Sequence, residues 1–354
     1  MDQRLCNLVG IQYPIVQAGM AGGPTTPELV AAVSKAGGLG TLGAGYMNAV
    51  AIKESIKKIK ELTDQPFAVN LFLPEEFVVD RQQIHRMQER LNTYREKLDL
   101  PLSPQVSKYG EDFQEQLEAV IESDVKIISF TFNCPSQTIM NKLKEHGITV
   151  IGTATTVKEA AILEEVGVDV IVAQGSEAGG HRGTFIGREE EALIGTIALV
   201  PQIVDKVNVP VIAAGGIMDG RGLVASLALG AAGVQVGTAF LTAEESGARQ
   251  LHQQAILECE ETDLQLTRAF SGKMARGIRN SFMAEMEKES DLPPYPVQNA
   301  LTNDIRKASA AKKNREYVHM WAGQAAPMGK KQPAAKIIET IMSEAKTIVH
   351  GIRF

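Results

Sequence analysis

The chain has 354 residues, of which 44% are hydrophobic, 22% charged and only 5% aromatic, proportions that exclude a disordered chain and favour an aliphatic core. Its formal net charge of −6 argues against nucleic acid and anionic membrane surfaces as partners, since both are polyanionic. No stretch reaches the ~18 apolar residues that would cross a bilayer, and the N-terminus lacks the apolar core of a signal peptide. We therefore expect a cytoplasmic protein whose partner is a small molecule, while homo-oligomer formation stays open.

A β/α rhythm runs along the first 240 residues. Eight short apolar or β-branched runs alternate with segments of helical periodicity such as 27–36 and 157–166; the runs lie at 14–19, 39–45, 67–72, 126–132, 149–155, 170–175, 210–216 and 233–240. Continuously apolar runs are typical of parallel strands covered on both faces. The pattern predicts an α/β fold, a (β/α)8 TIM barrel, with a doubly wound open sheet as the structural alternative.

Two segments interrupt this rhythm. Residues 74–125 are long and charged, with helical patches near 80–97 and 111–121, and we expect an excursion packed outside the barrel. Residues 243–304 contain the turn-prone DLPPYP and predict a small helical subdomain over the barrel mouth. The barrel would then comprise 1–242 and 305–354, with a last helix at 334–349 in the outer ring.

Cysteine chemistry is not indicated. Cys6, Cys134 and Cys259 lie far apart and form no CxxC pair, so we expect neither a disulfide framework nor a metal site. Cys134 ends a predicted strand, and we interpret it as a buried thiol rather than a nucleophile.

The residues at the carboxyl ends of the predicted strands are the candidate ligand-binding set, because barrel active sites are built there. Glycine-rich loops follow the seventh and eighth runs, where barrels usually hold a phosphate, although tight βα turns would need glycine too. Asn70 and Gln174 carry primary amides that suit the edge of a flat heterocycle or form part of the barrel rim. The full set is Ala18, Gly19, Met20, Asn70, Gln174, Gly179, Gly180, Gly215, Gly216, Gln235, Val236, Gly237 and Thr238.

His181 is the candidate general base. It follows Gly179 and Gly180, which remove side chains where a flat cofactor would lie against the backbone, and its imidazole can exchange a proton near neutral pH. Four other histidines lie in charged or helical surroundings and are interpreted as surface residues: His85, His146, His252 and His350.

Eight motifs together resemble the nitronate monooxygenase family, formerly called 2-nitropropane dioxygenases: VQAGMAGG, AVNLF, IGTAT, VAQGSEAGGHRGTF, VPVIAAGGIMDGRG, GVQVGTAFL, SGKMARGIRN and HMWAGQ. The resemblance spans nearly the whole chain. It implies noncovalent FMN, with the ring near Ala18 to Met20, Asn70, Gln174 and Gly179, and the phosphate near Gly216 and Gln235 to Thr238. It also implies that His181 is the catalytic base. The long 74–125 excursion departs from shorter family members.

The resemblance implies O2-dependent oxidation of alkyl nitronates to a carbonyl compound and nitrite, with propionate 3-nitronate as the toxin removed. Its carboxylate would need a cation, for which Arg182, Lys273 and Arg276 are the candidates. One alternative is a flavin-dependent enoyl-acyl-carrier-protein reductase, which would need NAD(P)H and a basic docking face. Another is a barrel that binds a phosphorylated ligand without catalysis.

Overall fold

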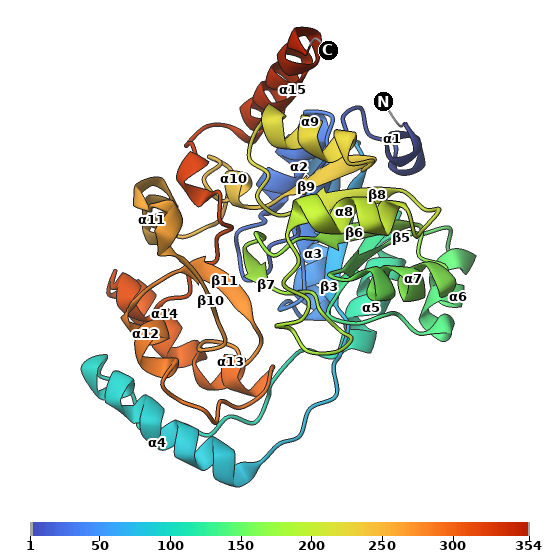
Figure 1. The fold of residues 1–354 in the computed structure, drawn as a ribbon. Coiled ribbons are helices and arrows are strands. Elements are labelled where there is room, and N and C mark those ends of the chain that lie inside the picture. Colours follow the sequence, from blue (N-terminus) through green and yellow to red (C-terminus); the bar gives the residue numbers. More distant parts are fainter. Residues whose placement is uncertain (1–2, 353–354) are drawn as a thin grey trace.

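Eight parallel strands form the barrel in the computed structural model, which describes residues 3–352 (Figure 1). Their order around the sheet is β1-β9-β8-β6-β5-β4-β3-β2, and a parallel bridge between Val16 and Leu39 joins its two ends. The strands are β1 (Ile15–Gln17), β2 (Gly40–Gly43), β3 (Phe67–Phe72), β4 (Ile127–Thr131), β5 (Thr149–Ala154), β6 (Val170–Gln174), β8 (Val211–Ala214) and β9 (Gly233–Val236). Each lies within one predicted run, so the barrel prediction is confirmed.

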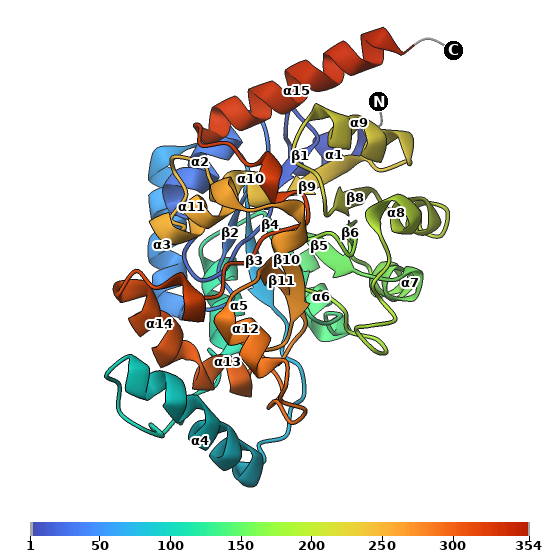
Figure 2. The ribbon, with the colours of Figure 1, turned by 60° about the vertical axis from the view of Figure 1, so that its left-hand side comes forward.

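An outer ring of helices covers the strands, as both ribbon views show (Figures 1 and 2). Side-chain alternation along the strands divides the aliphatic core: Val16, Ile151 and Ile212 belong to the cluster inside the barrel, whereas neighbouring residues such as Ile15 pack under the helices. The ring consists of α2 (Pro27–Lys35), α3 (Ala49–Leu62), α5 (Phe113–Glu122), α6 (Gln137–Glu145), α7 (Val157–Glu165), α8 (Thr196–Val204), α9 (Gly220–Ala228) and α15 (Ala334–Gly351), and α1 (Arg4–Val9) packs into the inner cluster.

A cap subdomain lies over the carboxyl ends of the strands. The sequence predicts helices here, and the cap has them, but it also has an antiparallel sheet of β10 (Leu264–Thr267), β11 (Ala275–Ile278) and β7 (Gly180–His181). The third strand comes from the barrel loop after β6, a non-local pairing that local periodicity does not reveal. The cap helices are α10 (Thr238–Leu241), α11 (Gln250–Glu258), α12 (Ser281–Met286), α13 (Val297–Leu301) and α14 (Asn303–Ala311), with 3-10 turns η1 (Glu261–Asp263), η2 (Arg315–Tyr317) and η3 (Ala326–Met328).

The 74–125 excursion serves two parts of the fold. Its second helix, α5, is the barrel helix between β3 and β4, whereas α4 (Arg81–Lys97) lies against the cap (Figures 1 and 2). Met87, Leu91 and Tyr94 of α4 share a buried apolar cluster with Phe270 and Phe282 of the cap. Among the described helices, none is long and apolar enough to cross a membrane.

Arg95 is the polar anchor between α4 and the cap. Its buried guanidinium donates from Nε to Asp304 Oδ2 at 2.8 Å and from Nη2 to the Leu301 carbonyl at 2.9 Å. Removing it would leave a half-buried carboxylate and a buried carbonyl without their donors.

We expect Arg95→Ala to lower the free energy of unfolding by on the order of 3 kcal/mol and to speed proteolysis within 74–112, because α4 loses its anchor. Arg90→Ala is the matched control, since Arg90 on the same helix makes only a part-exposed ion pair with Glu289 at 2.8 Å, worth about 1 kcal/mol or less. Urea titration and limited proteolysis measure both effects. Equal losses in the two variants would contradict the anchoring role of Arg95.

Candidate active site

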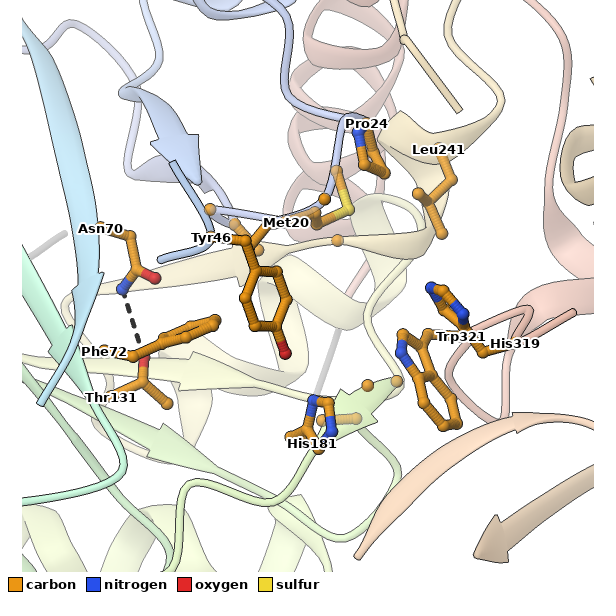
Figure 3. Close-up of a pocket in the computed structure, with 18 of the residues that line it drawn as sticks. Met20, Pro24, Tyr46, Asn70, Phe72, Thr131, His181, Leu241, His319 and Trp321 are labelled. Carbon is orange, nitrogen blue, oxygen red and sulfur yellow. Dashed lines mark hydrogen bonds between the residues drawn. The ribbon is translucent and has the colours of Figure 1, made fainter. Parts of the chain in front are cut away.

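A cavity of about 740 Å³ lies between the carboxyl ends of the barrel strands and the cap. Figure 3 shows Asn70, Phe72 and Thr131 of the barrel on one side, His319 and Trp321 on the other, and His181 and Tyr46 between them. Every candidate ligand-binding residue predicted from the sequence lines it except Val236. The Val236 side chain is buried in the core, and its carbonyl accepts a hydrogen bond from Ala18 N at 2.9 Å.

Asn70 presents an unsatisfied acceptor at this cavity. Its amide Nδ2 donates to Ser129 Oγ at 2.9 Å and to Thr131 Oγ1 at 3.2 Å, which orients the side chain at the end of β3 (Figure 3). Its Oδ1 is buried and has no hydrogen-bond partner among the described residues. Since burying an amide oxygen without a partner costs free energy, this atom indicates a ligand that carries an N–H or O–H donor.

The glycines supply backbone surface on the cavity wall. Gly215 and Gly216, after β8, have φ of 116° and 71°, and Gly180 has φ of 72°, a region that other residues rarely adopt. A Cβ on Gly180 would meet nothing within 4 Å and would only occupy cavity space. Gly179 has a different reason: its Cβ would lie 2.5 Å from the backbone of Ala322, so this glycine lets the barrel loop approach the cap.

Gln174 anchors the strand that carries the histidine. Its Nε2 donates to the His181 carbonyl at 3.0 Å, and its Oε1 accepts from Gly183 N at 2.7 Å. The sequence predicts that this amide meets a cofactor ring. In the structure it lines the cavity but holds the backbone on both sides of Arg182.

His181 is fixed in one tautomer by the cap. Its Nε2 lies 2.8 Å from Ser271 Oγ, and that hydroxyl donates its single proton to the Lys273 carbonyl at 3.1 Å. Ser271 must therefore accept from His181, which places the imidazole proton on Nε2 and leaves Nδ1 as a free base. The rings of Phe132, Tyr295 and Trp321 surround the imidazole, with centroids 5.4–5.9 Å away.

The pKa of His181 is lowered to about 3, first by burial and then by the positive charges of Lys273 and Arg306. The imidazole is therefore neutral at physiological pH. An unprotonated Nδ1 at the cavity can accept a proton from a bound carbon acid.

The three cations predicted for the substrate's carboxylate lie outside the cavity lining. Arg182 is fully buried and donates to the carbonyls of Gly175 and Gln174 at 2.6 and 2.9 Å. Arg276 donates from Nε and Nη2 to the Ser176 carbonyl at 3.1 and 2.9 Å. Lys273 forms an ion pair with Glu75 at 2.7 Å. Their hydrogen bonds hold loops behind the site, so the structure does not bring these cations to a substrate.

The cavity is lined instead by basic groups that the sequence did not reveal. Arg306 of α14 and His319 meet at 3.2 Å, and exposed Arg249 and Lys307 lie at the rim. His319 belongs to the HMWAGQ motif, which was a signal, whereas Arg306 lies in an ordinary amphipathic helix and gave none.

His252 is not a surface residue, so that interpretation was wrong. Its ring is buried at the cavity wall, Nε2 donates to the Trp321 carbonyl at 3.0 Å, and burial lowers its pKa to about 4. The burial of His252 comes from its contact with Trp321, a residue 69 positions away, which local composition cannot indicate. Residues 108–111 of the excursion also line the cavity, so that segment shapes the pocket as well as the exterior.

The architecture is shared with solved structures over nearly the whole chain. Nitroalkane oxidase from Streptomyces ansochromogenes superposes with a TM-score of 0.90 at 36% identity, covering 98% of this chain and 99% of that one. FabK from Thermotoga maritima superposes with a TM-score of 0.78 at 32% identity, covering 98% and 97%. An enoyl reductase domain of MlnA from Bacillus amyloliquefaciens, at 12% identity and a TM-score of 0.68, shares the fold alone.

Sequence comparisons point to one family. The nitronate monooxygenase family model matches residues 2–344. A probable nitronate monooxygenase of Staphylococcus haemolyticus (strain JCSC1435) is 49% identical over 355 residues, covering 99% of each chain, and one of Staphylococcus aureus (strain MSSA476) is 49% identical over 348 residues, covering 98% of each. With the barrel, the glycine loops and His181 arranged around a single cavity, this chain belongs to the nitronate monooxygenase family and is an oxidoreductase.

Proposed function

We propose that the chain binds FMN in the cavity and uses O2 to oxidise alkyl nitronates to a carbonyl compound and nitrite, with propionate 3-nitronate as the substrate it removes. The observation that carries this proposal is the pairing of two groups across one cavity. These are the unpartnered Asn70 Oδ1, which needs a donor from a ligand, and the neutral His181 Nδ1, which can take a proton.

The cavity wall fits a flavin mononucleotide. The family is one of flavin-dependent enzymes. Asn70 Oδ1 suits an N–H on the edge of the isoalloxazine ring, and Ala18, Gly19 and Gly180 offer backbone rather than bulky side chains to a flat ring. The loops of Gly215–Gly216 and Gly237–Thr238 would hold the terminal phosphate, as the loops after the last two strands do in other barrels.

FMN, when bound, supplies the redox chemistry, and the protein supplies position and proton transfer. A nitronate is an anion, so the exposed cations Arg249 and Lys307 on the cavity lining favour its entry. The neutral nitroalkane must first lose its α-proton, and His181 Nδ1 is the group that would accept it. Ser271 accepts the proton of Nε2 in a hydrogen bond, and this leaves Nδ1 without a proton.

The reductase alternative has weaker support. An acyl carrier protein is acidic and would need a basic docking face, whereas this chain carries a net charge of −6. The structural similarity to nitroalkane oxidase is also greater than that to FabK, at TM-scores of 0.90 and 0.78. A non-catalytic barrel would have no need of a base held in one tautomer.

The proposal predicts that the bound cofactor is FMN. No GxGxxG turn follows the first strand, so the sequence lacks the turn that usually binds a dinucleotide, and the phosphate loops suit a single terminal phosphate. Heat release of the chromophore and mass spectrometry should identify FMN at about one per chain. Recovery of FAD, or of no flavin after reconstitution with FMN, would contradict the proposal.

The second prediction separates the proposed activity from the reductase. Purified protein should consume O2 and release nitrite with preformed nitronates much faster than it oxidises NADH in the presence of an enoyl thioester. An oxygen electrode and a nitrite assay measure the first rate, and absorbance at the NADH band measures the second. Faster NADH oxidation would replace the monooxygenase proposal with the reductase.

The third prediction concerns His181, because a preformed nitronate already lacks the proton that a base removes. His181→Asn should lower activity on neutral nitroalkanes by on the order of 10² to 10⁴ and on nitronates far less. Exposed His85→Asn is the control and should change neither rate. Rates are normalised to bound flavin. An equal loss on both substrate forms would mean that His181 acts in anion binding or structure instead of proton removal.

A further inference from the structure

We propose that Arg306, supported by His319, binds a carboxylate at the far end of the substrate and so selects acidic nitronates over neutral ones. This inference rests on the proposed nitronate oxidation and adds a specificity-determining residue to it. Arg306 replaces the three buried cations that the sequence suggested for this role.

Arg306 is a buried charge without a carboxylate of its own. Arg306 is 9% exposed as a whole residue and lines the cavity. Its hydrogen bonds go to uncharged atoms: the Thr302 carbonyl, the carbonyl and side-chain oxygen of Asn299, and His319 Nδ1. Among the groups that shift its pKa the one carboxylate is Asp304, and Asp304 is already paired with Arg95 at 2.8 Å.

Lys273, another buried cation of the chain, has the carboxylate partners that Arg306 lacks. Lys273 lies 2.7 Å from Glu75 and 3.7 Å from Glu189. Burying a charge is costly unless an opposite charge accompanies it, and burial indeed lowers the pKa of Arg306 to about 10. A guanidinium that lines a cavity and lacks an internal counter-ion is a site for a bound anion.

The guanidinium also retains hydrogen-bonding capacity. It has five N–H donors, and the described residues accept four hydrogen bonds from it, so one donor stays uncommitted. Charge-assisted hydrogen bonds from arginine to carboxylate are among the strongest in proteins. The free donor and the uncompensated charge therefore favour the same kind of ligand.

His319 contributes a second donor without a second charge. A guanidinium can only donate, so His319 Nδ1 accepts from Arg306 and the proton of the neutral ring lies on Nε2. Burial, with the charge of Arg306 next, lowers the pKa of His319 well below its ordinary value. His319 lines the cavity beside Trp321, where Figure 3 shows both rings on the cap side.

The position of the pair limits how far a substrate must reach from His181 to Arg306. Trp321 lies between the two histidines, with its ring centroid 5.4 Å from that of His181 and 5.4 Å from that of His319. The two imidazoles are thus no more than twice that distance apart. A nitronate whose reacting carbon lies beside His181 can reach Arg306 with a carboxylate that is only a few bonds away, as in propionate 3-nitronate.

The test compares two nitronates of equal chain length, propionate 3-nitronate and propyl-1-nitronate, in the holoenzyme. The variants are Arg306→Gln, which removes the charge, and Arg306→Lys, which keeps it without the planar donors. Lys312→Gln is the control, since Lys312 flanks the same helix but its ammonium is exposed and pairs with Asp99. The readout is the ratio of kcat/KM for the two substrates, in which any loss of folded enzyme cancels.

Arg306→Gln should lower kcat/KM for the acidic nitronate by on the order of 10 to 10²-fold, the worth of a hydrogen bond to a charged group, and that for propyl-1-nitronate by less than about threefold. Arg306→Lys should fall between, and Lys312→Gln should keep the wild-type ratio. Succinate, which does not react, should perturb the flavin absorbance of wild type, and Arg306→Gln should weaken its Kd by a similar factor.

An unchanged ratio in Arg306→Gln, or equal losses on both substrates, would overturn the specificity role while leaving nitronate oxidation intact. If the wild-type holoenzyme oxidised neither nitronate, the proposed function itself would fail. The two failures are therefore distinguishable.

Discussion

The two hydrogen bonds of the Gln174 amide connect the barrel to the cap and set the position of His181. Gln174 ends β6, and its side chain holds the backbone of His181 and Gly183, so the chain leaves the barrel and forms β7. That strand then pairs with β11, which brings Ser271 to the imidazole. A backbone segment at a cavity needs partners for its own polar groups, and Gln174 and β11 supply them. The rigid link explains how a loop residue can be held in one tautomer.

The buried cations near the site fall into two groups. Outside the cavity lining, Arg182 and Arg276 donate to backbone carbonyls and Lys273 pairs with a carboxylate. These contacts stabilise the loops that carry the glycines and His181. On the lining, Arg306 is held by neutral acceptors alone. The arginines therefore differ in where they lie: Arg182 and Arg276 lie outside the cavity lining and hold loops, whereas Arg306 lines the cavity. The positive charges of both groups also keep the imidazole neutral.

Helix α4 of the 74–125 excursion packs against the cap and supports it. Helix α4 covers the apolar cluster around Phe270 and Phe282, and Arg95 ties α4 to the chain just before and within α14, the helix that carries Arg306. Trp321, between His181 and His319, also packs against Phe270. The cluster under α4 is thus continuous with the cavity wall. A segment inserted between β3 and β4 therefore supports the residues that would contact a substrate.

The sequence by itself determined the barrel, the glycine loops and the place of His181 at the strand ends. Eight apolar runs, the glycines at strand ends and the GGH loop depend on neighbours a few residues away, and parallel strands then bring their carboxyl ends together whatever the details of packing. The position of His181 at the cavity follows from that topology. Family resemblance added the chemistry, because the motifs are long and span the chain.

Only the tertiary structure decided which polar side chains face a ligand. Arg182 lies within the VAQGSEAGGHRGTF motif and Arg306 in an ordinary amphipathic helix, yet Arg182 donates to carbonyls and Arg306 is the one of the two that lines the cavity. The strands of the cap, the burial of His252 and the partners of Lys273 likewise depend on contacts between residues separated by tens to hundreds of positions. Hydrogen bonds and ion pairs of this kind form only after the chain has folded, so local periodicity carries no record of them.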